Sequence, residues 1–404
     1  MKMNNNRVSY GSYPSYPSLS IMMVLVLLLG MVGFSATPVS AKTSKACDVN
    51  SSTLQSQLEQ GRSSSIQEDI HFTDTDFLSQ TTGRAAGNGF LIGTSDSGCH
   101  WQKIYTGTWQ FSQIEFSSNT QGWALASAKS GQKPVFLTTT DGGATWKSPY
   151  KGNIRFNKID KKSGSTGFAY TTSGVYKTIN GGAAWTAIPT PANTRGGYFQ
   201  DSNTGWVVKT VSGSNSGYRI MQTIDGGNKW TTALSVGSLE VSGGEIYASG
   251  KQVWAILYGG AGMSQVSYSV YASSDSGKSW RQVFGQSTAG GGKAPGTGAL
   301  GNGEGPAQPG GHPGNMQFVG STIAYLAGGS PAGGKVAVGR SLDSGKTWNN
   351  MPATIDGISA DISFLSQNVG YLAVTDSLTP AIYTTKDGGK TWSATLKFVA
   401  TDKQ

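Results

Sequence analysis

Hydrophobic and polar positions alternate in short runs along most of this chain. A typical unit has an aromatic-containing segment, a polar turn, and then Gly, an aromatic residue and a small apolar run. One example is Ile114-Glu-Phe116 followed by Gly122-Trp123-Ala-Leu125, and another is Ile362-Ser-Phe364 followed by Gly370-Tyr371. Short alternating runs bounded by turn residues are typical of β-strands. The pattern therefore predicts an all-β chain built from repeated pairs of antiparallel strands.

A second phrase returns seven times: a hydroxyl residue, a spacer, Asp or Asn, a spacer, Gly, two spacers and Trp. We call each copy a repeat turn. The acidic or amide, glycine and tryptophan positions are Asp96, Gly98 and Trp101; Asp141, Gly143 and Trp146; Asn180, Gly182 and Trp185; Asp225, Gly227 and Trp230; Asp275, Gly277 and Trp280; Asp343, Gly345 and Trp348; and Asp387, Gly389 and Trp392.

The residue types of the repeat turn fit a tight connection between two antiparallel strands. The Asp or Asn side chain accepts hydrogen bonds from nearby backbone N–H groups, as in an Asx-turn. The Gly supplies a positive φ. The Trp ring then packs under the turn and anchors an otherwise polar hairpin. We expect these residues to be structural.

The repeat turns recur about every 45 residues, which is room for four strands. A four-stranded sheet is too small to bury both faces alone, and a closed ring leaves only short edges. The count predicts a seven-bladed β-propeller of four-stranded antiparallel blades. One longer interval, between Asp275 and Asp343, contains a Gly- and Pro-rich insertion over 285–315, which we expect to be a mobile loop.

The repeat turns resemble the Asp-box, or BNR, repeat, and the resemblance covers residues 66–400. Asp-box propellers are shared by sialidases, xyloglucan-cleaving glycosidases, sortilin-type receptors and the photosystem II stability and assembly factor family. The phrases Asn119-Thr-Gln-Gly122-Trp123 and Asn203-Thr-Gly205-Trp206 are most similar to the assembly-factor, YVTN/BNR-like group. That resemblance implies a chaperone or scaffold that acts outside the cytoplasm without a chemical step.

The N-terminus has the features of a secretory leader. An apolar run from Leu19 to Phe34 follows a basic start, and Val39 and Ala41 provide small residues for cleavage after Ala41. We expect a signal peptide over 1–41, an N-terminal segment over 42–65 and the propeller over 66–400. The apolar run is close to the lower limit for spanning a bilayer, so an uncleaved membrane anchor is the alternative.

Both cysteines of the chain, Cys47 and Cys99, follow the predicted cleavage site. In an oxidising compartment they predict one disulfide, and two separate thiols are the alternative. The three histidines, His71, His100 and His312, have no metal-ligand spacing relative to the cysteines. We expect no metal and no cofactor.

The formal charge of +9 is spread over scattered Lys and Arg residues. Such scatter indicates a solvated surface, so no nucleic-acid partner is expected. A protein partner is the main expectation, and a carbohydrate ligand is the alternative. Membrane contact is expected only if the leader is retained.

Two kinds of enzyme share the repeat. A sialidase needs three convergent arginines, the first usually in an Arg-Ile-Pro phrase, which this sequence lacks. A glycosidase needs a pair of carboxyl groups across a cleft. The candidates for such a pair are Glu115, Asp160, Asp201, Glu240, Glu245 and Asp361. A structural role in a strand or turn is the favoured interpretation of these acids, and the sequence favours binding over catalysis.

Overall fold

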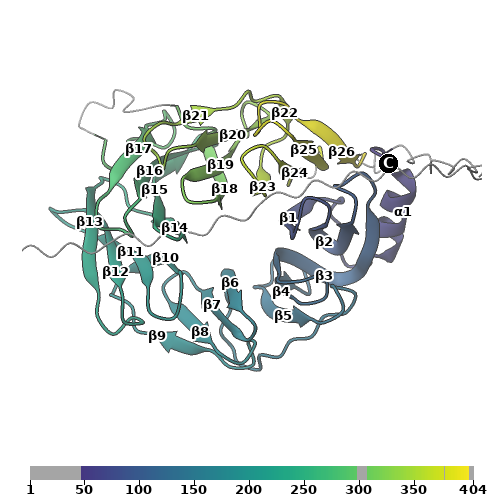
Figure 1. The fold of residues 1–404 in the computed structure, drawn as a ribbon, viewed down its shortest axis with the longest axis horizontal. Helices are drawn as coiled ribbons and strands as arrows, with labels where there is room; N and C mark the ends of the chain where they lie inside the picture. Colours follow the sequence, from purple (N-terminus) through teal and green to yellow (C-terminus); the bar gives the residue numbers. More distant parts are fainter. Residues whose placement is uncertain (1–46, 298–306, 377, 400–404) are drawn as a thin grey trace, which may run out of the picture. The chain divides into compact units, whose positions relative to one another are not determined.

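A computed structural model describes residues 47–297, 307–376 and 378–399. The predicted signal peptide over 1–41 lies outside the described residues. One helix, α1 (Ser52–Gly61), precedes 26 strands, and the strands form antiparallel sheets arranged in a ring (Figure 1). The lowest-numbered strand of each sheet lies towards the centre. The described chain is therefore an all-β propeller with a short N-terminal helix.

Six sheets are formed by the described residues. The first has the order β1 (Phe72–Phe77), β2 (Gly83–Thr94), β3 (Gln102–Phe116), β4 (Gly122–Ser127) and β5 (Val135–Thr139). The second and third are β6 (Lys158–Ser163), β7 (Thr166–Tyr170), β8 (Val175–Thr178) and β9 (Thr186–Ile188), and β10 (Thr194–Phe199), β11 (Gly205–Val211), β12 (Gly217–Thr223) and β13 (Thr231–Gly237). The fourth is β14 (Gly243–Ser249), β15 (Gln252–Gly262), β16 (Gln265–Ser273) and β17 (Arg281–Gln286). The last two are β18 (His312–Val319), β19 (Ile323–Ser330), β20 (Lys335–Ser341) and β21 (Asn349–Asn350), with β22 (Ile355–Asp356) paired to β20, and β23 (Ala360–Phe364), β24 (Gly370–Val374), β25 (Ala381–Thr385) and β26 (Ser393–Lys397).

The prediction of seven blades was wrong, because the described residues form six sheets. The difference arises at β3, a continuous strand of 15 residues. Its beginning pairs with β2, where Phe90 lies opposite Thr106, and its end pairs with β4, where Phe116 lies opposite Gly122. The first two sequence repeats therefore share one five-stranded sheet. Counting turns cannot reveal that a strand continues from one repeat into the next.

Aromatic stacking between neighbouring sheets explains the spacing of the aromatic residues. Phe168 of β7 stacks on Phe199 of β10 with ring centroids 4.9 Å apart. Tyr325 of β19 stacks on Phe364 of β23 at 3.6 Å, and Tyr371 of β24 stacks on Phe77 of β1 at 3.5 Å. Each fully buried aromatic side chain contributes about 1.5–3 kcal/mol relative to its exposed form. The phrase Gly-aromatic-apolar therefore builds the interface between consecutive sheets.

The N-terminal segment closes the ring beside the last sheet. The backbone N–H of Lys397 donates to the carbonyl oxygen of Val49 at 2.7 Å. Leu54 and Leu58 of α1 are buried in the same cluster as Phe72 and Phe398, which joins α1, β1 and the chain after β26. This contact stabilises the ring because it covers the edge where the first and last sheets meet.

The Gly- and Pro-rich insertion lies between β17 and β18, and its described ends are bound to β16. The Ser267 and Ser269 hydroxyls donate to the carbonyl oxygens of Gly292 and Pro295 at 2.5 and 2.6 Å. The Tyr268 hydroxyl donates to the carbonyl oxygen of Gly310 at 3.0 Å. The described parts of the insertion are thus held to the sheet by hydroxyl groups.

Candidate functional site

The repeat turns share one hydrogen-bond pattern, shown here for the turn at Asp141. The Asp141 carboxylate accepts from the Thr139 hydroxyl at 2.8 Å and from the backbone N–H and hydroxyl of Thr145 at 2.9 and 2.6 Å. Gly143 has a φ of 100°, which strongly favours glycine. Hydrogen bonds from Thr145 lower the pKa of Asp141 to about 2. The acids of the repeat turns are therefore committed to local structure.

The tryptophans of the repeat turns are buried to different extents. Trp101 and Trp348 are buried, whereas Trp146, Trp185, Trp230, Trp280 and Trp392 are half-buried at the edges of the hydrophobic clusters. The indole N–H of Trp230 donates to the carbonyl oxygens of Pro189 and Gly227 at 2.9 and 3.1 Å. These side chains connect each turn to the sheet beneath it.

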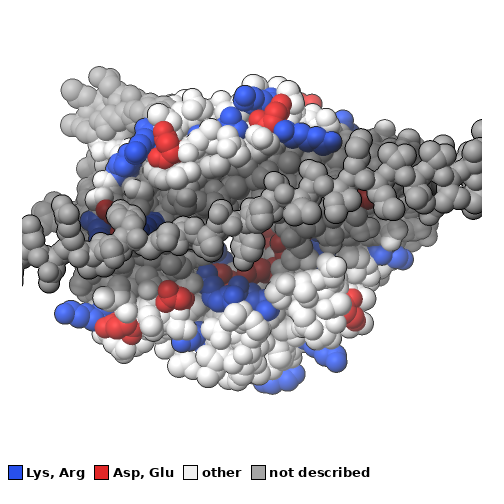
Figure 2. All heavy atoms as spheres, in the orientation of Figure 1, with Lys and Arg blue, Asp and Glu red and all other residues white. Residues whose placement is uncertain are grey.

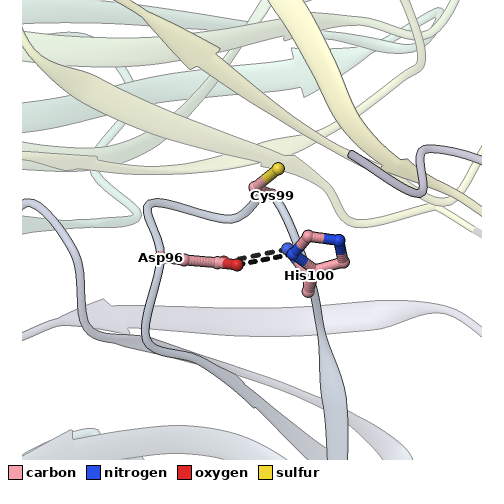
Figure 3. A group of neighbouring side chains, drawn as sticks. All are labelled: Asp96, Cys99 and His100. Atoms are coloured by element: carbon pink, nitrogen blue, oxygen red, sulfur yellow. Dashed lines mark hydrogen bonds and ion pairs between the residues drawn. The ribbon is translucent and has the colours of Figure 1, made fainter. Parts of the chain in front are cut away.

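The structure joins Cys47 and Cys99 in a disulfide. Asp96, Cys99 and His100 lie close together in the first repeat turn (Figure 3). The Asp96 carboxylate accepts from the backbone N–H of His100 at 2.9 Å and lies 2.6 Å from its Nδ1. A disulfide sulfur is not the thiolate that binds metals. This group fits a capped turn tied to the N-terminal segment.

The candidate functional site is a cavity of about 770 Å³ at the centre of the ring, which we call the central cavity. Its walls come from the innermost strands β1, β3, β6, β10, β14, β18 and β23. Five carboxylates line it: Asp74, Asp76, Glu115, Glu245 and Asp361. A smaller hollow of about 400 Å³ shares Glu115, Lys158 and Tyr247 with it and also includes Asp160.

The acids of the central cavity bind the backbone of the neighbouring strand. The Asp361 carboxylate on β23 accepts from the backbone N–H of Thr75 on β1 at 3.0 Å. The Asp74 carboxylate on β1 accepts from the N–H of Ile114 on β3 at 2.6 Å, and that of Asp76 accepts from Phe116. These bonds satisfy N–H groups that the innermost strands would otherwise leave unpaired.

Acid and amide side chains make the same kind of hydrogen bond between β3 and β6 and between β18 and β23. Glu115 on β3 accepts from the backbone N–H of Lys161 on β6 at 2.9 Å, and the Gln113 amide exchanges two 2.8 Å hydrogen bonds with Ile159. Between β18 and β23, Asn315 exchanges two hydrogen bonds with Ile362, at 2.8 and 2.9 Å. Polar side chains therefore bridge three successive junctions between sheets, β18 to β23, β23 to β1 and β3 to β6, and also link β1 to β3 within the first sheet.

Burial raises the pKa of several of these carboxyl groups. The pKa of Asp361 rises to about 7 and that of Asp76 to about 6, mainly because the charged form loses hydration. Burial, together with the nearby charge of Asp160, raises the pKa of Glu115 to about 8. Burial and the charge of Asp361 raise the pKa of Asp74 well above its ordinary value. The surroundings of the cavity therefore favour the neutral form of these four carboxyl groups more than water does.

Two basic residues and Glu245 complete the polar lining. The Lys158 ammonium lies 4.6 Å from the centre of the Tyr247 ring. The Arg195 guanidinium donates to the carbonyl oxygen of Thr194 at 2.9 Å. Both oxygens of Glu245 accept from tyrosine hydroxyls, one from Tyr247 and one from Tyr258. Each of the five cavity carboxylates thus has a hydrogen-bond donor within the protein.

The structure brings together some of the acids that the sequence singled out for a catalytic pair. Glu115, Glu245 and Asp361 line the central cavity, and Asp160 lies in the smaller hollow, 2.6 Å from Lys162. Asp201 lies elsewhere, in the turn between β10 and β11, where it accepts from the N–H groups of Asn203 and Thr204 at 2.8 Å. Glu240 lies in the loop between β13 and β14, where it lines a different hollow.

Sequence reasoning missed Asp74, Asp76, Lys158 and Arg195 as lining residues of the cavity. The signal for the two aspartates was present in Thr73-Asp74-Thr75-Asp76, because residues two apart on a strand share a face. Nothing in the sequence indicates that this face meets the inner end of β3. No sequence motif marks Lys158 or Arg195 as a residue of the cavity.

A second hollow of about 510 Å³, which we call the side hollow, adjoins the central cavity and shares Ser242 and Pro313 with it. Its walls come from the loop before β14, the end of β15 and the first residues of β16 and β18. Leu239 and Met263 lie in the loops beside it and are 82% and 81% exposed. Two large apolar side chains are therefore exposed to solvent in loops that border this hollow.

Basic and acidic side chains alternate around the visible face of the ring rather than forming a patch of one sign (Figure 2). Among the described residues, no helix has the length and apolar character needed to cross a membrane.

No protein-family model and no functionally curated protein matches the sequence. Solved structures do resemble the fold. YCF48 from Cyanidioschyzon merolae is 18% identical, with a TM-score of 0.50 over 80% of this chain and 97% of that one. YCF48 bound to a D1 peptide is 18% identical, with a TM-score of 0.49 over 80% and 93% of the two chains.

The same fold occurs in an enzyme of larger size. AFV00434, described as an ancestral GH74 enzyme, is 15% identical, with a TM-score of 0.53 over 82% of this chain and 46% of that one. At these identities the likeness establishes architecture alone. The comparisons support a β-propeller with YCF48 among its structural neighbours.

Proposed function

We propose that this protein is a non-enzymatic propeller that binds another protein at the face formed by the central cavity and the side hollow. The observation that carries the proposal is the engagement of all five cavity carboxylates by protein donors. A glycosidase needs one carboxyl group free to deliver a proton and a second free to attack or to activate water. Carboxylates that hold neighbouring strands together suit a scaffold better.

The exposed apolar side chains favour a protein as the ligand of this face. Leu239 and Met263 project from loops next to a hollow of about 510 Å³. Apolar anchors surrounded by polar groups are the usual composition of a protein interface. The sequence resemblance to assembly factors and the YCF48-like architecture agree with this role. We therefore propose an assembly or stability factor as its specific form.

An extracytoplasmic location is part of the proposal. It rests on the N-terminal leader predicted from the sequence and on the bond between Cys47 and Cys99, since disulfides persist in oxidising compartments. Detection of the protein in the exported fraction, with an N-terminus at Lys42, supports this part. Retention in the cytoplasm contradicts it.

Site-specific crosslinking tests the binding face. A photoreactive residue placed at Leu239 or Met263 of the full chain is expected to give one discrete adduct with a partner in the exported fraction. The matched control is Ile179, which is 70% exposed in a repeat turn. Adducts at all three positions, or at none, contradict the proposed face.

An activity assay separates this function from the carbohydrate alternative. The purified protein is expected to release no reducing sugar from β-glucans and no sialic acid from sialosides. Release that disappears in both Glu115→Gln and Glu245→Gln variants, while the fold is retained, contradicts the non-enzymatic role.

A further inference from the structure

The first repeat turn differs from the others in the two residues before its tryptophan. These residues are Cys99 and His100, whereas the other six turns have Ala, Asn or Lys and then Thr, Ala, Lys or Ser. In the second turn, the Thr145 hydroxyl donates to the Asp141 carboxylate at 2.6 Å. In the first turn the His100 ring takes that place, with its Nδ1 2.6 Å from Asp96. The turn itself therefore requires neither a sulfur nor an imidazole at these positions.

This turn places one sulfur, one ring nitrogen and one carboxylate oxygen within a small volume (Figure 3). The ligand atoms of Asp96, Cys99 and His100 all lie within 4.8 Å of one another. Atoms bound to zinc at about 2.0–2.3 Å in a tetrahedron lie about 3.3–3.8 Å apart. Small side-chain movements therefore bring these atoms to the spacing of a zinc site.

The group is accessible to an ion from solvent. The His100 and Asp96 side chains are 30% and 42% exposed, and Cys99 is half-buried. The Oδ1 atom of Asp96 closes the turn, because it accepts from the Thr94 hydroxyl and from the backbone N–H of His100, both at 2.9 Å. The Oδ2 atom of Asp96 lies against the His100 ring instead. An ion can therefore bind Oδ2 while Oδ1 keeps the turn closed.

Cys47 supplies a fourth ligand when its disulfide with Cys99 is open. The Cα atoms of the two cysteines are 4.5 Å apart. Hydrogen bonds also hold this segment in place. The backbone N–H of Asp48 donates to the carbonyl oxygen of Cys99 at 3.2 Å. The backbone N–H of Lys397 donates to that of Val49 at 2.7 Å. Both thiols are therefore expected to stay at the turn after reduction.

We propose that the reduced chain binds one zinc ion through the side chains of Cys47, Asp96, Cys99 and His100. The ion then joins the N-terminal segment to the first repeat turn in place of the disulfide. Two sulfurs, an imidazole nitrogen and a carboxylate oxygen are ligands that zinc takes in tetrahedral sites. The disulfide and the zinc site exclude each other, because zinc binds thiolates. This site is separate from the proposed binding face, since it uses no residue of the central cavity or the side hollow.

The exchange between the two states balances in electrons and protons. A dithiol reductant transfers two electrons and two protons to the S–S bond and itself becomes a disulfide. Zinc binding then displaces one proton from each of the two thiols. The site therefore exists in the chain before its cysteines are paired, and again after a dithiol has reopened the bond. Release of the ion and oxidation of the two thiols restore the disulfide.

Titration of the full-length protein with Co²⁺ and then Zn²⁺ tests the proposal. The protein is reduced without oxygen and freed of reductant, and Co²⁺ reports a tetrahedral thiolate site through its visible and near-ultraviolet absorption. One ion per chain is expected to bind, and Zn²⁺ is expected to displace it. The oxidised protein is expected to give no thiolate-to-cobalt band. Absence of that band from the reduced protein, or an equal band in the oxidised protein, overturns the proposal.

Two conservative variants separate metal binding from turn structure. His100→Thr introduces the hydroxyl that closes the second turn at Thr145. Asp96→Asn introduces the amide that closes the third turn at Asn180. Each variant is expected to weaken zinc binding by the reduced protein more than about tenfold, since changes beside metal ligands already cost about 10–100-fold. The matched control, Asp141→Asn, is expected to leave zinc affinity unchanged. Wild-type affinity in both variants refutes the assigned ligands.

Stability gives a second readout that does not depend on absorption spectra. Zn²⁺ is expected to raise the urea midpoint of the reduced wild type, because it binds the folded chain. The midpoints of the oxidised wild type and of reduced His100→Thr are expected to stay unchanged. A rise of equal size in His100→Thr contradicts the proposal, because it shows that the ion acts at another site.

Discussion

Asp361 binds Thr75 twice across 286 positions of sequence, with its carboxylate accepting from the Thr75 hydroxyl at 2.6 Å and from its backbone N–H at 3.0 Å. The two residues lie on β23 and β1, so this pair joins the last sheet to the first. Asp74 and Asp76 link β1 to β3 in the same way, and Glu115 links β3 to β6, so buried acids help to hold the ring together.

Stability is expected to fall as the pH rises from about 5 to about 9. The folded-state pKa values of Asp76, Asp361 and Glu115 are raised to about 6, 7 and 8. The folded state therefore binds more protons than the unfolded chain. The associated stability is present below pH 4 and is lost as the pH rises through the folded-state values. The loss is on the order of several kcal/mol, measurable by urea denaturation across this range.

The variant Asp361→Asn tests the origin of that pH dependence. Removing one carboxyl group with a raised pKa is expected to make the decline of stability with pH shallower. At pH 9 the variant is expected to be at least as stable as the wild type. The matched control is Asp356→Asn at an exposed ion pair with Lys335. A decline as steep in Asp361→Asn as in the wild type contradicts the assignment.

Loss of a repeat-turn acid is expected to destabilise the fold without affecting the cavity. Asp141→Ala removes three side-chain acceptor contacts within the turn and is expected to cost about 1–2 kcal/mol, as for other capping side chains. Thr140→Ala, an exposed change in the same turn, is the control. Thermal unfolding measures both, and equal midpoints count against the capping role.

The stability cost of replacing a repeat-turn tryptophan by alanine is expected to increase with the burial of its side chain. Trp348 is 5% exposed and Trp230 is half-buried, so Trp348→Ala is expected to cost about 3–5 kcal/mol and Trp230→Ala less. Lys229→Ala is expected to leave stability within about 0.5 kcal/mol, because its side chain is exposed. Chemical denaturation gives the three values, and a cost for Lys229→Ala equal to that of Trp230→Ala argues against an anchor role.

Reduction of the disulfide is expected to weaken the attachment of the N-terminal segment to the propeller. The bond between Cys47 and Cys99 spans 52 positions and holds the segment before α1. Its loss is expected to cost about 2–4 kcal/mol. Urea midpoints with and without dithiothreitol measure the effect, and Cys47→Ser is expected to be insensitive to the reductant. An unchanged wild-type midpoint shows that the N-terminal segment stays attached without the disulfide.

The all-β propeller architecture was predictable because its signals are local. In a repeat turn the hydroxyl residue, the acid and the residue four positions later bond to one another, so an eight-residue phrase specifies the hairpin, as at Thr139, Asp141 and Thr145. The aromatic residue after Gly, such as Tyr371, likewise marks the strand that packs on the next sheet.

The sheet count and the candidate site were decided only by tertiary structure. The number of sheets depends on β3 continuing from its pairing with β2 to its pairing with β4, which the turn phrase does not encode. The cavity is lined by side chains whose partners lie about 40 or more positions away, as for Asp74 with Ile114 and Asp361 with Thr75. Sequence determined which segments fold as hairpins because those hydrogen bonds form within a few residues. The identity of the cavity residues followed from the closure of the ring, since only closure brings the innermost strands together.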